Sequence, residues 1–405
     1  RDLHMIKKGV TNNHWLLPQG IEEALPADAA RLESLRRQLL DIYASWGYQL
    51  VMPPMIEFLE SLLTGTGYDL DLQTFKLIDQ LTGRSMGLRA DMTPQVARID
   101  AHRLKTGVPS RLCYMGTVLH TMSDGFGSSR SPFQAGVELY GHGGIESDVE
   151  VLCLMVETLS AANIDTLYID IGHVGIYRGL SKQAGFNREQ EAALFEMMQR
   201  KAIPEIQAFI REQQLPQPMA DMLNLLPELH GGEACLQRAS EAFAEADDEV
   251  KAALSYLQQA VDLFKTRVSD VCIHFDLSEL RGYHYHTGLL FAAYTTGEGQ
   301  EIARGGRYDD IGKVFGRARP ATGFSTDLKT LLNLSNYTSN RLTDDAILAP
   351  ALSTTDDDAA LWTKIRKLRA QGETVIQSLP GQQGDASELG CGRSLIKVEG
   401  EWLVR

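Results

Sequence analysis

The sequence has few cysteines and no long apolar run. Its five cysteines among 405 residues are widely spaced and form no CxxC pair, so neither a disulfide framework nor a zinc ribbon is predicted. No stretch approaches the ~18 consecutive apolar residues that a membrane span needs, and no signal peptide opens the chain. We therefore expect a protein of a reducing compartment, the cytoplasm, with no membrane partner.

The common catalytic motifs are also missing. The chain contains no GxxxxGK[ST], GxGxxG, HExxH or GxSxG, which excludes the usual phosphate-loop, dinucleotide, zinc-protease and serine-hydrolase interpretations. Basic residues are in deficit, because 39 Lys and Arg face 53 Asp and Glu for a formal net charge of −14. Binding to a phosphate backbone depends on cations that displace counterions, so a nucleic-acid partner is disfavoured.

The apolar pattern that is present indicates mixed secondary structure. Apolar residues three and four apart predict an amphipathic helix over residues 26–47, and a strand is expected over residues 48–58. From there to about residue 145, β-type runs alternate with turns, and helical periodicity returns over residues 147–163. The pattern predicts an α+β fold in which helices flank an antiparallel sheet.

Changes in composition and in hydrophobic periodicity divide the chain further. Residues 187–268 have the composition and period of helices, and strand signals resume after them, which predicts a helical insertion in a core of residues 1–332. The polar, turn-rich residues 333–344 indicate a linker. Residues 345–405 carry the pattern of a strand, a helix, a second strand and a hairpin, so we expect a small C-terminal α/β unit.

Polar residues inside apolar, strand-like contexts are the candidates for a site. Asp91 and Thr93 lie two apart in LRADMTPQVAR and are expected on one face of a strand, as are Gln134 and Glu138 in QAGVE. Carboxylates for an amine, together with an arginine for a carboxylate, would suit a small zwitterion. Each residue taken alone is more often a solvated strand end.

The segment RGYHYHTG raises the question of a metal site. His284 and His286 would share one face of a strand, but no third ligand lies close in sequence, so no metal is predicted. Arg281 opens this segment, and Tyr308 lies in the later segment GGRYDD. Both residue types fit the zwitterion pocket better than a metal site.

Six segments in this order carry a family resemblance: GYQLVMPPMIEF, LRADMTPQVAR, RLCYMG, FQAGVELYG, RGYHYHTG and GGRYDD. Together they resemble the catalytic core of histidyl-tRNA synthetases, a class II aminoacyl-tRNA synthetase fold, over about residues 18–332. The resemblance implies a histidine-binding pocket made by Asp91, Thr93, Gln134, Glu138, Arg281, Tyr285 and Tyr308. Two positions depart from the family, since Asp91 replaces a glutamate and His286 replaces a tyrosine.

The nucleotide half of the resemblance is degenerate. In the family, the strand that corresponds to YMGTVLHTM ends in a four-residue pattern: phenylalanine, arginine, any residue and glutamate. The positions that hold charged nucleotide contacts in the family are filled here by His120, Met122, Ser128 and Thr330. A histidine near its usual pKa is mostly neutral at pH 7, whereas arginine offers a permanent, bidentate charge. We expect adenylate formation to be negligible.

A synthetase-like core without these contacts, followed by a short C-terminal unit, resembles the regulatory subunits of the short-form ATP phosphoribosyltransferase. That resemblance implies no catalysis and no cofactor in this chain. It implies activation of a short catalytic subunit, which uses Mg²⁺ to condense ATP with phosphoribosyl pyrophosphate in a glycosyltransferase holoenzyme, and feedback inhibition by histidine. Dimers within a hetero-octamer are expected. A residual histidyl-tRNA synthetase and a stand-alone histidine-binding protein are the alternatives.

Overall fold

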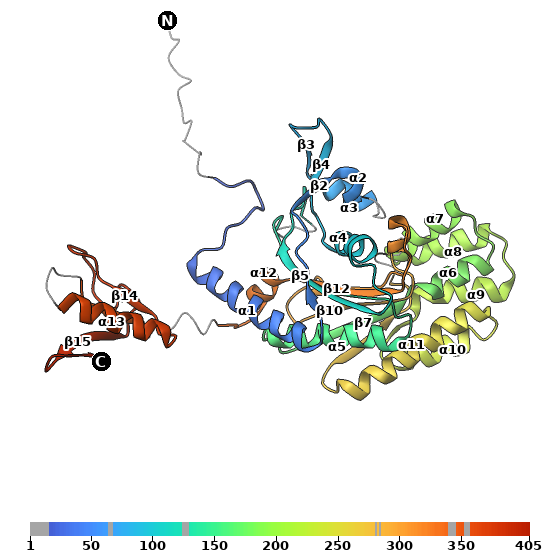
Figure 1. The fold of residues 1–405 in the computed structure, drawn as a ribbon. Helices are drawn as coiled ribbons and strands as arrows, with labels where there is room; N and C mark the ends of the chain where they lie inside the picture. Colours follow the sequence, from blue (N-terminus) through green and yellow to red (C-terminus); the bar gives the residue numbers. More distant parts are fainter. Residues whose placement is uncertain are drawn as a thin grey trace, which may run out of the picture. The chain divides into compact units, whose positions relative to one another are not determined.

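The computed structural model describes residues 16–63, 68–123, 129–279, 282, 285–338, 346–351 and 357–405. The chain divides into two compact units, one of residues 1–25 and 35–337 and the other of residues 26–34 and 338–405 (Figure 1). Helix α1, Pro26–Ser45, begins with a proline in its first turn and buries Leu35, Leu39 and Tyr43, which recur at helical spacing. No helix among the described residues is long and apolar enough to cross a membrane.

A nine-stranded sheet forms the centre of the larger unit. Its strands, in spatial order, are β1 Gln49–Leu50, β5 Ser110–Thr117, β6 Phe133–Tyr140, β12 Ala321–Asp327, β11 Ala303–Arg307, β10 Leu289–Tyr294, β7 Tyr168–His173, β9 Cys272–Asp276 and β8 His230–Gly231. The pairs β1–β5 and β7–β9 are parallel, and all other neighbours in this sheet are antiparallel. The largely antiparallel sheet that the sequence predicts is therefore present.

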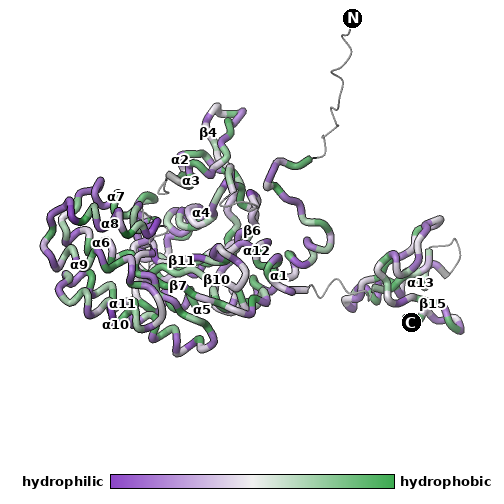
Figure 2. Tube along the Cα trace, turned by 180° about the vertical axis from the view of Figure 1, so that it is seen from behind, coloured by the Kyte–Doolittle hydropathy of each residue, from purple (hydrophilic) through white to green (hydrophobic). Residues whose placement is uncertain are grey.

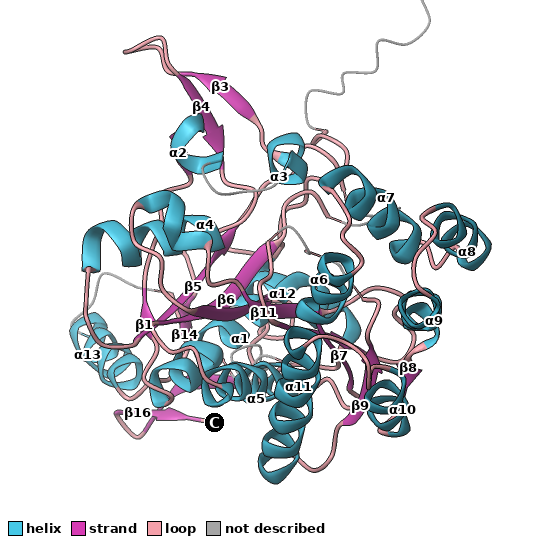
Figure 3. Cartoon of the chain, turned by 90° about the vertical axis from the view of Figure 1, so that its right-hand side faces the viewer, coloured by secondary structure: helices cyan, strands magenta, loops and turns pink. Residues whose placement is uncertain are grey.

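Helices cover both faces of this sheet (Figure 3). On one face lies α4, Thr93–Arg98, which continues into a π-helix at Ile99–Leu104 and packs its apolar residues against β5 and β6. On the other face, α5, Ile145–Ala161, lies beside α11, Asp248–Arg267. The core cluster between α4 and the sheet contains several tyrosines and adjoins the candidate site.

The predicted insertion, residues 187–268, is helical apart from its links. Its helices are α7 Arg188–Gln199, α8 Ile203–Glu212, α9 Gln217–Leu225, α10 Ala234–Ala242 and α11, and α6 Val174–Gln183 precedes them. Asn187 caps α7 through a reciprocal capping box with Gln190. Hydrophobic and hydrophilic residues alternate along these helices (Figure 2). The segment also contributes β8, so it supplies an edge strand to the main sheet as well as helices.

One expected strand is divided. Residues 48–58 form β1 and, after a gap, β2 Ile56–Phe58, which belongs to a separate sheet with β4 Ser85–Leu88 and β3 Lys76–Ile78. Pro53 and Pro54 separate the two strands, because neither proline has the N–H that a continuous ladder requires. The short helices α2, Leu59–Leu63, and α3, Tyr68–Gln73, lie between β2 and β3 in the chain.

The smaller unit contains the elements expected for a C-terminal α/β unit. Strands β14 Val375–Gln377, β13 Ile347–Ala349, β15 Arg393–Val398 and β16 Glu401–Val404 form one sheet in that order, and α13, Asp357–Ala370, packs against its core. The β15–β16 turn places Glu399 and Gly400 at φ of 49° and 88°. Two successive positive φ values are typical of the tight hairpin turns that match strand twist.

Candidate functional site

Strand β6 carries two of the predicted pocket residues. Gln134 and Glu138 lie four apart on it and therefore share a face, as the sequence predicts. Between them, Gly136 pairs with Tyr114 of the neighbouring strand β5. A Cβ at Gly136 would collide with the Tyr114 ring, so the glycine lets the tyrosine cross the strand between the two polar side chains.

Asp91 and Thr93 do not lie on a strand, so that expectation is wrong. Asp91 lies in the turn after β4, and Thr93 is the first residue of α4, where Pro94 follows in the first helical turn. The Asp91 carboxylate accepts the Thr93 backbone N–H at 3.0 Å, an Asx-type turn that starts the helix. Both side chains still reach the predicted pocket, through a different backbone.

Gln134 connects this turn to the sheet. Its side-chain Nε2 donates to Asp91 Oδ1 at 2.8 Å, and its Oε1 accepts the Met92 backbone N–H at 3.0 Å. The amide is thus held at both ends, and it fixes the Asp91 carboxylate at the entrance to the pocket. The structure brings Asp91, Thr93, Gln134 and Glu138 together from two separate segments.

A chain of hydroxyl groups leads from α4 to the buried carboxyl of Glu138. Tyr114 donates its hydroxyl hydrogen to Glu138 Oε1 at 3.0 Å, and Thr93 Oγ1 lies 3.0 Å from the Tyr114 hydroxyl oxygen. Glu138 is only 1% exposed. Burial raises the pKa of Glu138 well above its usual range, and the negative charge of Asp91 acts in the same direction. The environment therefore favours the protonated carboxyl.

Two tyrosines complete the described part of the pocket. The rings of Tyr285 and Tyr308 are stacked, with centroids 5.0 Å apart and planes inclined by 18°. Tyr308 follows β11, whereas Tyr285 and His286 lie in the chain before β10 begins, so the strand expected across RGYHYHTG is wrong for these two residues. Backbone N–H groups of both residues donate to Gly282 O in this turn. Arg281 and His284 lie outside the described residues.

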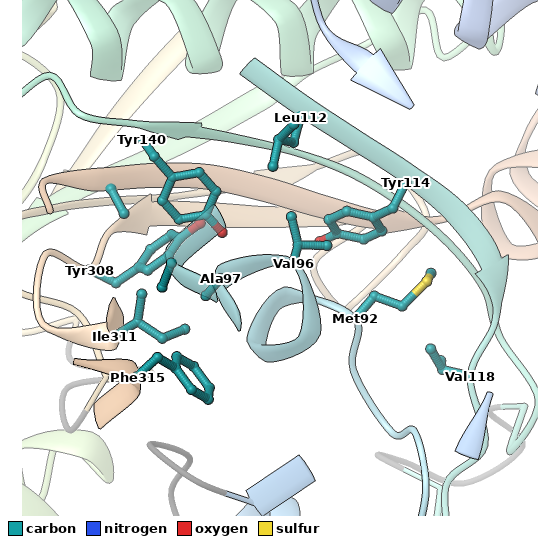
Figure 4. Packing of buried hydrophobic residues seen from close by; sticks show 12 residues of the cluster. Met92, Val96, Ala97, Leu112, Tyr114, Val118, Tyr140, Tyr308, Ile311 and Phe315 are labelled. Atoms are coloured by element: carbon teal, nitrogen blue, oxygen red, sulfur yellow. The ribbon is translucent and has the colours of Figure 1, made fainter. Parts of the chain in front are cut away.

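Sequence reasoning missed Tyr114 and Tyr140 as parts of the site. Both are buried on strands and belong to the cluster that contains Tyr308 (Figure 4). Their signal in the sequence was weak, because a tyrosine in an apolar strand is ordinarily a core residue. The glycine in FQAGVELYG was the available clue, since glycine inside a strand indicates close approach of another group.

Two of the four positions of the degenerate nucleotide site, His120 and Thr330, make internal contacts. His120 lies beyond the end of β5, and its Nε2 is 2.8 Å from the Ala90 carbonyl oxygen. The Thr330 hydroxyl donates to Asp327 Oδ2 at 2.8 Å at the start of α12, Leu328–Leu334. Met122 is 60% exposed and also follows the strand, which ends at Thr117 rather than at 122 as YMGTVLHTM suggested. Ser128 lies outside the described residues.

A cleft of about 650 Å³ has Asp91 and Gln134 as well as His120 and Thr330 in its lining, whereas Thr93, Glu138, Tyr285 and Tyr308 are not among its lining residues. The charged residues of this lining are Glu22, Asp91, Glu298, Glu301, Arg304, Asp327 and Lys329. Among the described residues of this lining, carboxylates therefore outnumber cations. Lys329 Nζ already donates to the Ser131 carbonyl oxygen at 2.7 Å. Such a lining repels a polyphosphate rather than attracting it.

Comparison with known proteins identifies the family. A family model described as histidyl-tRNA synthetase matches residues 20–331, and one described as ATP phosphoribosyltransferase subunit HisZ C-terminal domain matches residues 344–405. The chain is 58% identical over 394 residues to an ATP phosphoribosyltransferase regulatory subunit of Thioalkalivibrio sulfidiphilus, covering 97% of this chain and 98% of the relative. The chain belongs to the family of ATP phosphoribosyltransferase regulatory subunits. The predicted family is confirmed, and with it a regulatory role.

Further relatives agree with this family. A regulatory subunit of Alkalilimnicola ehrlichii is 53% identical over 395 residues, covering 97% of this chain and 98% of the relative. A solved structure described as an ATP phosphoribosyltransferase regulatory subunit/histidyl-tRNA synthetase from Bacillus halodurans has a TM-score of 0.82 at 27% identity, and covers 93% of this chain and 95% of that chain. Histidyl-tRNA synthetase from Nostoc sp. PCC 7120 shares the fold with a TM-score of 0.75 at 20% identity, covering 94% and 91%. The predicted synthetase-like fold is confirmed.

Proposed function

We propose that this chain is the non-catalytic regulatory subunit of an ATP phosphoribosyltransferase, which carries out the first step of histidine biosynthesis. In this proposal it activates a separate, short catalytic subunit, and that subunit binds the Mg²⁺ and performs the glycosyltransferase chemistry. The observation that carries the proposal is the 58% identity over almost the whole of both chains to a regulatory subunit. The family match over residues 344–405 supports the same assignment for the C-terminal unit.

The chemistry of the cleft argues against adenylation by this chain. His120 and Thr330 contact neighbouring protein groups and supply no permanent positive charge to a phosphate. Each charged hydrogen bond lost from a nucleotide site costs roughly 1.5–3 kcal/mol. Losing two or three together would slow adenylyl transfer by about 10³-fold or more. A regulatory chain has no use for that reaction.

We propose that histidine binds in the pocket of Asp91, Thr93, Gln134, Glu138, Arg281, Tyr285 and Tyr308. Support comes from the described members, which offer carboxyl groups, an amide and stacked aromatic rings within one site. A histidine that favours the inhibited state of the complex must bind that state more tightly than the active state. Feedback inhibition then follows from differential binding at this pocket.

The proposed assembly is a hetero-octamer of four regulatory and four catalytic subunits, in which the regulatory chains pair as dimers. The net charge of −14 gives no support to a nucleic-acid partner. A cytoplasmic location is part of the proposal, and the five cysteines, all unpaired, are compatible with a reducing compartment. No cofactor is assigned to this chain.

Mixing the purified chain with a short catalytic subunit tests the proposal. We expect a complex of larger mass, a higher rate of phosphoribosyl transfer to ATP, and inhibition of that rate by histidine. Glu138→Gln is the matched variant, which should assemble normally and respond to histidine less. If neither mass nor rate changes, the proposed function is wrong. Histidine-dependent pyrophosphate exchange with ATP would instead indicate a synthetase, and histidine binding without assembly a stand-alone binding protein.

A further inference from the structure

The hydroxyl of Tyr114 is the centre of a fixed hydrogen-bonded chain. Tyr114 is fully buried, and its hydroxyl hydrogen is donated to Glu138 Oε1 at 3.0 Å. Because a phenol has one hydrogen, the contact of 3.0 Å with Thr93 Oγ1 requires the threonine to donate. The direction of each hydrogen bond between α4 and β6 is thereby set by the tyrosine.

Two glycines leave space for the side chains of Tyr114 and Glu138. A Cβ at Gly136 would meet the ring and hydroxyl of Tyr114, and a Cβ at Gly323 of β12 would meet Glu138 Oε2. Gly323 is the residue paired with Glu138 across the two strands. The carboxyl is therefore confined between the backbone of β12 on one side and the phenol of Tyr114 on the other.

The second oxygen of this carboxyl has no hydrogen-bond partner among the described residues. Glu138 Oε2 is buried and makes no hydrogen bond with the described residues, and the same is true of the hydroxyl groups of Tyr140, Tyr285 and Tyr308. Figure 4 shows the hydroxyl groups of Tyr114 and Tyr140 directed toward the same part of the cluster. Buried polar atoms without partners are costly, so four of them in one place indicate groups kept for a ligand.

Glu138 and these tyrosines are close enough to influence one another. Burial raises the pKa of Tyr140 and of Tyr285 well above the usual value, and the Glu138 carboxyl, when ionised, raises both further. We infer that Tyr114 is a positioning residue of the histidine site, which holds Glu138 Oε1 and so leaves Oε2 available to the bound ligand. This inference rests on the proposed histidine pocket.

An infrared measurement without ligand tests the positioning directly. The carboxyl band that disappears in Glu138→Gln belongs to Glu138, and Tyr114→Phe is expected to shift that band because it removes one hydrogen bond and keeps the ring. Thr93→Val leaves Tyr114 in place and should shift the band less. Tyr43→Phe is the control, since Tyr43 is equally buried and contacts Thr158 instead. A band unmoved by Tyr114→Phe overturns the inference.

Histidine binding, measured by calorimetry on the full chain, supplies the second test. Tyr114→Phe and Glu138→Gln are each expected to weaken binding about tenfold, the effect of one lost hydrogen bond to an ionisable group. The double variant should bind no more weakly than the weaker single variant, because both changes remove the same interaction. Additive losses would show a merely structural role and overturn the inference. A wild-type chain that binds no histidine contradicts the proposed pocket, while the infrared result still decides the role of Tyr114.

Discussion

Arg307 and Asp148 form a buried ion pair that joins strand β11 to helix α5. The Arg307 Nη2 lies 2.9 Å from Asp148 Oδ1, and the side chains are 6% and 0% exposed. Tyr256 of α11 donates its hydroxyl to Asp148 Oδ2 at 2.5 Å. Arg307 immediately precedes the pocket residue Tyr308. The pair therefore holds the end of β11 against α5 and α11, which lie on the face of the sheet opposite to α4.

Breaking this pair should destabilise the fold strongly. Arg307→Met leaves Asp148 buried without a compensating charge, and we expect the free energy of unfolding in urea to fall by about 3–5 kcal/mol. Lys182→Met is the matched control, because its ion pair with Glu249 lies at the surface with side chains 74% and 45% exposed. No measurable change is expected there. If both substitutions lowered the free energy of unfolding equally, burial would not explain the contribution of the Arg307–Asp148 pair.

His173 should make the stability depend on pH. Burial lowers the pKa of His173 from 6.5 to about 4, and the charges of Arg178 and Arg307 act in the same direction. Between these values the unfolded chain binds a proton that the folded chain does not, so stability falls as the pH drops below about 6.5. The loss should approach about 3 kcal/mol near pH 4.

The variant His173→Asn tests this origin of the pH dependence. The side chain of His173 accepts the Gly175 N–H at 3.1 Å as the cap of α6, and asparagine also caps helices well. Urea unfolding across this pH range should give a shallower profile for the variant than for the wild type. If the free energy of unfolding changes equally with pH in the variant and the wild type, other titratable groups cause the acid sensitivity.

Asp327 should contribute through its contacts at the start of α12. Its Oδ1 accepts the backbone N–H groups of Phe133 at 2.8 Å and Lys329 at 3.1 Å, and its Oδ2 accepts the Thr330 hydroxyl. Asp327→Ala removes these acceptors, and we expect a loss of about 1–2 kcal/mol in thermal or urea unfolding. Asp327→Asn retains an acceptor and should lose less. A variant pair with identical stability would show that the cap is unimportant.

Local sequence patterns failed where chain geometry changes abruptly. The alternation of LRADMTPQVAR suggested a strand, but Pro94 and the Asx-type turn at Asp91 begin a helix instead. The apolar run after Tyr114 suggested a strand to Met122, yet β5 ends at Thr117. Strand ends depend on where a neighbouring strand stops pairing, and one segment does not contain that information.

No local sequence pattern could predict contacts between residues that are far apart in the chain. Arg307 and Asp148 are 159 residues apart, and neither lies in a pattern that marks an ion pair. Tyr114 belongs to the site only because β5 pairs with β6 in the register that places it opposite Gly136. The raised pKa of Glu138 likewise comes from burial by β12 and α4, which follow from the assembled sheet.

The sequence by itself determined the fold class, the family and the common face of Gln134 and Glu138, because ordered motifs and the two-residue period of a strand are properties of the chain alone. Only the tertiary structure decided which groups meet across segments: Tyr114 with Glu138, and Arg307 with Asp148. The physical reason is that strand register, burial and desolvation arise when distant segments pack, and the charges and hydrogen bonds of the site depend on that packing.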